Sequence, residues 1–292
     1  MMQNPQRIPV VINTAVAWLQ AHWIINSALV IGYALFILLA HNAFVQHSIW
    51  VMNALTLPVY NGVVAGIAGV FGVLFVLLML SFLRTKKPER PRKLFYLIAI
   101  LLLLVVHHIF LFEMNIEVIH AMQFAVLGFL LFPFTERFGA AIAMGIPIMM
   151  LDEWYQYRVL YPDYVQYFDF NDILMDILGC ALLFCGMWIV GVRTKPAPQP
   201  IYRRPEIILM SALSVAILGA MFTCTIAFFP ENECLNTWLV LNKLPNPIIF
   251  WQAHPFTGRI YHAIPPMEGM AVILGISLFF LGMGDQKEKH QI

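Results

Sequence analysis

The chain has 292 residues, of which 61% are hydrophobic and only 11% are charged, and its formal net charge is +1 at pH 7. Soluble globular domains are roughly 45–50% apolar, so this composition excludes an ordinary soluble domain and indicates an integral membrane protein. Most of the basic residues lie in short loops between apolar segments, which gives no support to nucleic-acid binding.

Eight apolar segments approach the length of about 20 residues that a membrane-spanning helix needs. A further segment, 9–23, is apolar but is interrupted by Asn13, Gln20 and His22, so we expect an interfacial helix there. The predicted fold class is all-α, a polytopic membrane helix bundle with about eight transmembrane helices. The expected spans are 24–40, 59–83, 94–112, 118–135, 138–155, 173–192, 207–229 and 267–284.

The basic residues predict the orientation. Loop 84–93 carries six of the 17 Lys and Arg residues, and loop 193–204 carries four. Two more lie in the C-terminal tail, and Arg7 and Arg137 fall on the same side. Only Arg158, Lys243 and Arg259 fall on the other side. By the positive-inside rule both termini are cytoplasmic, and we expect a multi-pass protein of the cell membrane, namely a bacterial inner or cytoplasmic membrane.

The two basic loops divide the chain into three parts. Residues 1–93 form the interfacial helix and two spans, and residues 94–192 form a four-helix membrane domain. Residues 193–292 comprise a basic cytoplasmic loop, two spans and a long outer loop at 230–266. The lipid bilayer is the expected environment of all three parts.

Two features predict contacts with other membrane subunits. Gly62, Gly66 and Gly69 lie near one helix face, and small residues at such spacing let helices approach closely. The loop 230–266 is long and aromatic, and a long loop in a compact protein usually has a function.

The four cysteines give no pattern of a metal or redox site. Cys180, Cys185 and Cys224 fall within expected spans, only Cys234 falls in a loop, and the chain has no C-x-x-C pair. We therefore expect neither a disulfide framework nor a thiol redox site nor a structural zinc site.

Six carboxylates are concentrated in the stretch 151–179. Asp163 and Asp169 have an ordinary explanation as loop and helix-capping residues, and five tyrosines between 155 and 167 are expected to form an aromatic girdle at headgroup level. The other four acids lie at or inside helix ends, where an ionisable side chain is costly and indicates a functional site. These are Asp152, Glu153, Asp172 and Asp176.

The preceding span begins with further polar residues, including Glu113. Three outer helix ends are therefore expected to converge on a polar pocket that is open to the outside. The candidate ligand-pocket residues are Glu117, His120, Gln123, Asp152, Glu153, Gln156, Asp172 and Asp176.

At these residues the chain resembles the VanZ-like family of membrane proteins, named for a teicoplanin-resistance protein. The resemblance covers about 94–192 and rests on "HAMQFAVLGFLL" (120–131), "DEWYQ" (152–156) and "FDFNDILMDILG" (168–179). It implies a role at the cell envelope. Where the family usually has Lys, Arg and Asn, this chain has Glu117, Gln166 and Asp176. Each change removes a positive charge or adds a negative one, so an anionic group such as a pyrophosphate would need a cation here.

Three functions follow from these residues. The first is a VanZ-like protein that binds an envelope-derived or lipid-linked ligand from the extracytoplasmic side. The second is a non-catalytic subunit of a larger membrane complex. The third is a metal-assisted membrane enzyme, because Glu117 and His120 have the spacing of bundle metal sites and this ligand chemistry suits Mn²⁺, Fe²⁺ or Zn²⁺. Catalysis is not established by the sequence and no cofactor is firmly implied.

Overall fold

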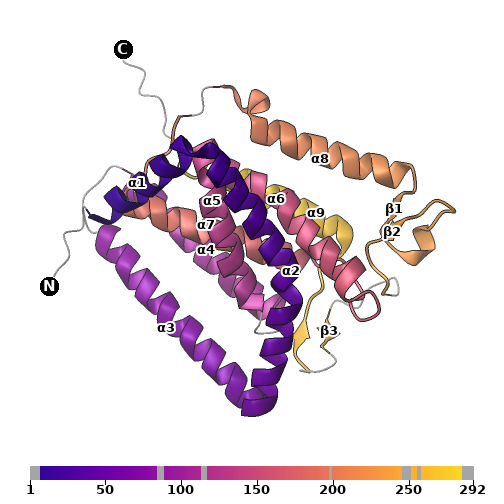
Figure 1. Ribbon diagram of the computed structural model, residues 1–292. Helices are drawn as coiled ribbons and strands as arrows, with labels where there is room; N and C mark the ends of the chain where they lie inside the picture. The colour runs from indigo at the N-terminus through magenta and orange to yellow at the C-terminus, as the bar shows by residue number, and fades with distance from the viewer. Residues whose placement is uncertain are drawn as a thin grey trace.

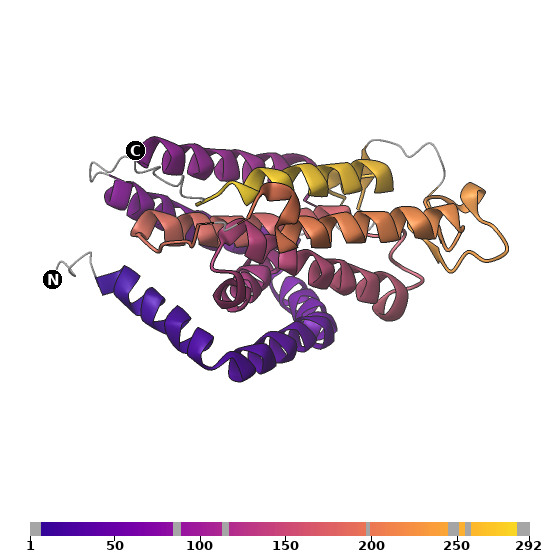
Figure 2. The same ribbon diagram turned by 90° about the horizontal axis from the view of Figure 1, so that it is seen from above.

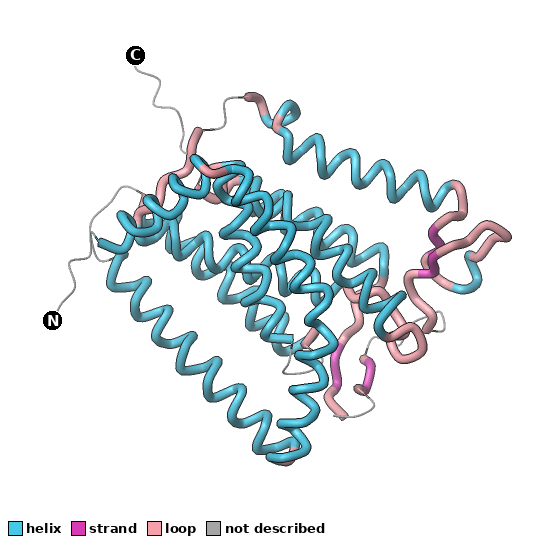
Figure 3. Tube along the Cα trace, viewed as in Figure 1, coloured by secondary structure: helices cyan, strands magenta, loops and turns pink. Residues whose placement is uncertain are grey.

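The computed structural model describes residues 7–83, 89–112, 117–196, 199–244, 251–254 and 258–284. Within these ranges the chain forms nine α-helices and two small two-stranded sheets (Figure 1, Figure 3). The helices are α1 (Arg7–Ala21), α2 (Trp23–Leu55), α3 (Leu57–Leu83), α4 (Arg90–Phe110), α5 (Val118–Thr135), α6 (Phe138–Tyr155), α7 (Phe170–Val190), α8 (Pro205–Phe222) and α9 (Pro266–Leu281).

Six of these helices are long and apolar enough to cross a membrane, namely α2, α3, α4, α5, α7 and α8. The all-α fold of a multi-pass membrane protein is thereby confirmed. The interfacial segment expected at 9–23 forms the separate helix α1, which ends before α2 begins at Trp23. The predicted spans 118–135 and 138–155 coincide with α5 and α6.

Helix α7 lies at the centre of the bundle, and 89% of its apolar 18-residue stretch is buried. Helices α4, α5, α6 and α9 pack around it (Figure 1, Figure 2). The helix begins where the Asp169 side chain accepts hydrogen bonds from the backbone N–H groups of Asn171 and Asp172, which satisfies donors that have no partner within the helix. It ends at Gly191, whose φ of 111° suits glycine.

Helices α5 and α6 form a tight antiparallel pair. Glu136 ends α5 in the left-handed conformation and its N–H donates to the carbonyl of Phe132. At its other end α6 widens into a π turn, Gln156–Leu160. Such turns occur frequently at functional sites, and this one directly follows the acids of the predicted pocket.

Helices α3 and α8 stand away from the bundle (Figure 1). Only 6% of the apolar 18-residue stretch of α3 is buried, and only 11% of the corresponding stretch of α8. Helix α3 packs at one end, where Phe75 and Met79 lie against Gly186 of α7, whereas every residue from 65 to 74 is exposed. Apolar side chains exposed around the whole helix are stable only in lipid or against a partner.

The segment between α8 and α9 covers one end of the bundle. It contains the parallel pair β1 (Ile226–Ala227) and β2 (Leu239–Val240) and the antiparallel pair β3 (Gln252–Ala253) and β4 (Ile260–Tyr261). The backbone N–H of Phe168 donates to the carbonyl of Leu241 at 2.8 Å. This bond ties the segment to the residues that lead into α7.

The structure corrects the expectations for two sets of residues. Helix α8 ends at Phe222, not near 229, and Cys224 lies beyond it with a φ of 56° and forms a disulfide with Cys234. The expectation that no cysteines are paired was wrong, because the helix ends before the apolar run 223–228, which contains strand β1.

Tyr157 and Tyr167 are buried, so they do not belong to an aromatic girdle. Cys180 and Cys185 are free and buried, as expected.

Candidate functional site: a buried carboxylate–imidazole cluster

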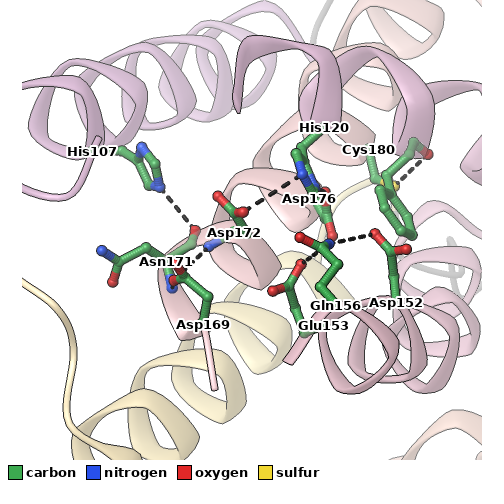
Figure 4. Close-up of polar contacts among 11 residues, drawn as sticks. His107, His120, Asp152, Glu153, Gln156, Asp169, Asn171, Asp172, Asp176 and Cys180 are labelled. Atoms are coloured by element: carbon green, nitrogen blue, oxygen red, sulfur yellow. Dashed lines mark hydrogen bonds and ion pairs between the residues drawn. The ribbon is translucent and has the colours of Figure 1, made fainter. Parts of the chain in front are cut away.

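The imidazole of His120, on the first turn of α5, lies against two acids of α7. Its Nε2 is 3.5 Å from Asp172 Oδ2 and its Nδ1 is 3.3 Å from Asp176 Oδ1. Asp172 and Asp176 are four residues apart and therefore share a helix face. Figure 4 shows the three side chains facing one another.

Close packing of α5 on α7 brings these groups together. A Cβ atom added to Gly179 would overlap the backbone of Ala121, the residue after His120. Only glycine permits this approach. Gly179 lies one turn beyond Asp176, so the closest contact between the two helices is next to the His120–Asp176 pair.

The end of α6 supplies two more acids and an amide. Gln156 Nε2 donates to Asp152 Oδ2 at 3.2 Å and to Glu153 Oε1 at 2.9 Å (Figure 4). Gln156 is the first residue of the π turn, and its own N–H donates to the carbonyls of Asp152 and Glu153. The amide thus bridges the two carboxylates, and Asp152 Oδ1 remains without a hydrogen-bond partner.

The cluster is closed, which differs from the open pocket that we expected. The exposed fraction is 0% for Asp152 and Asp176, 2% for Glu153 and 8% for Asp172. One reason is that α2, which we expected to end near residue 40, continues to Leu55. It carries His41 over the cluster, and the ring centroids of His41 and His120 are 5.6 Å apart.

Several oxygens of the cluster have no hydrogen-bond partner. They are Asp152 Oδ1, Asp172 Oδ1 and both carboxylate oxygens of Asp176. Burying an ionised carboxylate without a partner is strongly unfavourable. Among the described residues, the ion-pair partner of Asp172 and Asp176 is His120 alone, and no Lys or Arg forms an ion pair with any of the four acids. With all four acids ionised, the cluster would have more negative charge than its own side chains balance, so it needs protons or a bound cation.

Two groups of side chains are placed to hold a metal ion. In each group the potential ligand atoms all lie within 4.8 Å of one another. The first group is His41, His120 and Asp152, and the second is His120, Glu153 and Asp172. Imidazole nitrogen with carboxylate oxygen is a donor set that suits Mn²⁺, Fe²⁺ or Zn²⁺, so the residues fit such an ion.

Other predicted residues take different positions. Glu117 is buried and belongs to neither group of potential metal ligands, and its carboxylate interacts with Arg259 of the segment between α8 and α9. Gln123, one turn beyond His120, is buried with its Oε1 atom unpaired. Asp163 is exposed and Asp169 caps α7, as expected. Glu113 lies outside the described residues, as do 84–88 of the first basic loop and the tail 285–292.

Sequence reasoning missed His41 and Asn171. His41 lies in a largely apolar stretch of α2 near the expected end of the span, and only the packing of α2 on α5 shows that it meets His120. Asn171 stands beside Asp172, where the acids drew attention, yet its buried side chain bonds to Leu111, His262 and Ile264. The signal that could have found both is a polar side chain in an apolar surrounding.

No protein-family model matches the chain, and the comparisons with curated proteins and with solved structures find no match either. The resemblance to the VanZ-like family stays a prediction that rests on the three motifs.

Proposed function

We propose that the chain crosses the membrane eight times with both termini in the cytoplasm, in a bacterial inner or cytoplasmic membrane. Helices α6 and α9 complete the eight, and the distribution of Lys and Arg supports the orientation. The Cys224–Cys234 disulfide lies on the side opposite the basic loops, as expected in an oxidising compartment. Reporter fusions after Lys86 and Lys195 should read cytoplasmic, and one after Asn242 should read external. An external signal at Lys195 would reverse the orientation.

On this topology we infer that the chain is a VanZ-like membrane protein that binds an envelope-derived or lipid-linked ligand near the extracytoplasmic face. One observation carries the proposal. His120, Glu153 with Gln156, and Asp172 are the residues of the three motifs, and they meet in one buried cluster although they lie on different helices. Residues that only capped the ends of their own helices would not need to lie close to one another in the fold.

The test is to identify what the protein retains from its own membrane. The full chain is isolated in lipid nanodiscs without detergent, and the bound lipids and lipid-linked molecules are measured by native mass spectrometry. We expect a defined species with the wild type that is lost in Asp172→Asn. Asp163→Asn, in the exposed loop, is the control and should retain it. The same bulk lipids in wild type and Asp172→Asn, with no species lost, would refute the proposal.

A second candidate function is that of a non-catalytic subunit, which the exposure of α3 favours. Gly62, Gly66, Gly69 and Gly72 have nothing within 4 Å of an added Cβ, so this small-residue face has no partner among the described residues. Such faces pack closely against other helices in membranes. A photo-crosslinker at position 66 should give a defined adduct in cells, whereas one at the lipid-exposed Val215 of α8 should not. Diffuse labelling at both positions would contradict this role.

A further inference from the structure

The 3.5 Å separation of His120 Nε2 from Asp172 Oδ2 is long for a hydrogen bond between a nitrogen donor and an oxygen. It is the separation of two ligands of one metal ion, because tetrahedral ligands with bonds of about 2.1 Å lie about 3.4 Å apart. The donor atom of Glu153 lies within 4.8 Å of both. Small side-chain movements would close this triangle on an ion.

The other nitrogen of His120 has the partner that a metal-bound imidazole needs. Nδ1 lies 3.3 Å from Asp176 Oδ1, and Asp176 is fully buried. A histidine that binds a metal through one nitrogen usually directs the other to a carboxylate, which fixes the ring and raises its basicity. His120 would therefore lie between the metal and Asp176. The two acids that face its two nitrogens, Asp172 and Asp176, are one turn apart on α7.

Unpartnered oxygens give a second, independent sign of a ligand. Asp152 Oδ1, Asp172 Oδ1 and Asp176 Oδ2 are buried without a hydrogen bond, and none of the three takes part in the ion pairs with His120. Figure 4 shows these acids in the cluster that contains His120 and Glu153. Buried carboxylates bind cations or take up protons. The imidazole beside them is a metal ligand, and three protein ligands leave coordination positions open, as in catalytic sites.

We propose that His120, Glu153 and Asp172 bind one divalent transition-metal ion, with Asp176 as the positioning residue for His120. The proposal deepens the proposed function and rests on it in one respect: the ion supplies the positive charge through which an anionic ligand would bind to an acidic cluster. The site itself is independent of that ligand and is tested with the metal alone.

The experiment uses the full chain in nanodiscs, first depleted of metal with a chelator. Mn²⁺ binding is measured by equilibrium dialysis with elemental analysis. The wild type should bind one Mn²⁺ per chain. Glu153→Gln and Asp172→Asn should weaken binding by more than about 100-fold, and Asp176→Asn by about 10- to 100-fold. Asp163→Asn should bind as the wild type does. Equal, weak binding by wild type and Asp172→Asn would overturn the proposal in favour of protonated carboxylates.

A measurement on the wild type alone keeps the assignment testable if a variant does not fold. Pulsed electron paramagnetic resonance of bound Mn²⁺ on protein with ¹⁵N-labelled histidine counts the coordinated imidazoles. If His120, Glu153 and Asp172 are the ligands, the Mn²⁺ signal should show coupling to one histidine imidazole. Coupling to two imidazoles would mean that the ion is bound by His41, His120 and Asp152, and it would overturn the assignment. In Asp176→Asn the coupling should change while the melting temperature stays that of the wild type, which a merely structural role of Asp176 would not produce.

The failure of the site and the failure of the proposed function can be told apart. If Mn²⁺ binds with one imidazole but no lipid-linked species is retained, the metal site stands and the ligand proposal fails. If metal-free protein retains the species, and the wild type binds Mn²⁺ no more tightly than Asp172→Asn does, the ligand proposal stands and the metal site is refuted.

Discussion

The carboxamide of Asn171 holds the backbone of His262. Its Nδ2 donates to the carbonyl of His262 at 2.9 Å and to that of Leu111 at 2.9 Å, while its Oδ1 accepts from the N–H of Ile264 at 3.2 Å. Asn171 is 1% exposed and directly precedes Asp172. One side chain therefore joins the start of α7, the residue after α4 and the segment between α8 and α9, and it does so beside the carboxylate cluster.

Asn171→Ala should destabilise the protein and loosen the segment between α8 and α9. The substitution leaves two buried carbonyls and one N–H without partners, and a buried unsatisfied group costs about 1–3 kcal/mol. We expect a lower melting temperature and faster hydrogen exchange in residues 258–264. Asn232→Ala, an exposed residue of the same segment, should change stability by less than about 0.5 kcal/mol. Unchanged exchange in 258–264 would show that Asn171 does not hold this segment.

Gly179→Ala tests the packing of α5 on α7. In an exposed helix this change would stabilise by up to about 1 kcal/mol. Here the new Cβ would overlap the backbone of Ala121, and backbone cannot move aside as a side chain can, so we expect a net loss of about 1–3 kcal/mol. The melting temperature should fall, and His120 should shift away from Asp176.

The matched control for Gly179 is Gly219 of α8, where an added Cβ meets nothing within 4 Å. Gly219→Ala should leave the melting temperature unchanged or raise it slightly. If both alanine variants behaved alike, the close approach of α5 and α7 would not exist.

Much of the fold could be predicted because one physical signal dominates it. A long, continuous apolar run is expected to form a helix in lipid, because a helix satisfies the backbone groups of the run within that one segment. The boundary between α5 and α6 was predicted because Glu136 and Arg137 interrupt two apolar runs. The limits of α2 and α8 were not predicted, because hydropathy cannot tell where a helix leaves the membrane.

The cluster could be predicted in part for a similar reason. Glu153 with Gln156, and Asp172 with Asp176, share helix faces by their spacing, and acids at helix ends in an apolar chain are conspicuous. The contact of His41 with His120 depends on how distant segments pack, which no local spacing encodes. The pairing of Cys224 with Cys234 is local, at a separation of 10 residues, and depends on the end of α8 at Phe222. Glu117 matched a metal-site spacing with His120, yet its carboxylate interacts with Arg259 of a segment that lies far away in the sequence.

The cysteines give a prediction about the compartment. Cys224 and Cys234 should be oxidised in cells, since their Cα atoms are 5.8 Å apart and the geometry permits a disulfide. Cys180 and Cys185 should remain free thiols, because both are buried. Alkylation before and after reduction, followed by mass spectrometry, separates the two pairs. Quantitative alkylation of Cys234 without reduction would place this loop on the reducing, cytoplasmic side.

The ion pair between Arg137 and Glu206 fastens α8 to the bundle. Arg137 Nη1 and Nη2 donate to the two carboxylate oxygens of Glu206, both at 2.6 Å, and the side chains are 11% and 3% exposed. Arg137 precedes α6 and Glu206 lies in the first turn of α8. Since little of α8 is otherwise buried, this pair is a main contact between that helix and the rest of the protein.

Removing one partner should cost more than removing both. Glu206→Met leaves a largely buried guanidinium unpaired. The loss of one partner of a buried pair costs about 3–5 kcal/mol, whereas an apolar replacement of both is often nearly neutral. We therefore expect Arg137→Met and Glu206→Met each to lower the melting temperature sharply and the double variant to recover most of it. The exposed pair Lys195–Glu136 is the control, and Lys195→Met should cost less than about 1 kcal/mol. Additive losses in the double variant would mean that the two charges stabilise α8 separately and not as a pair.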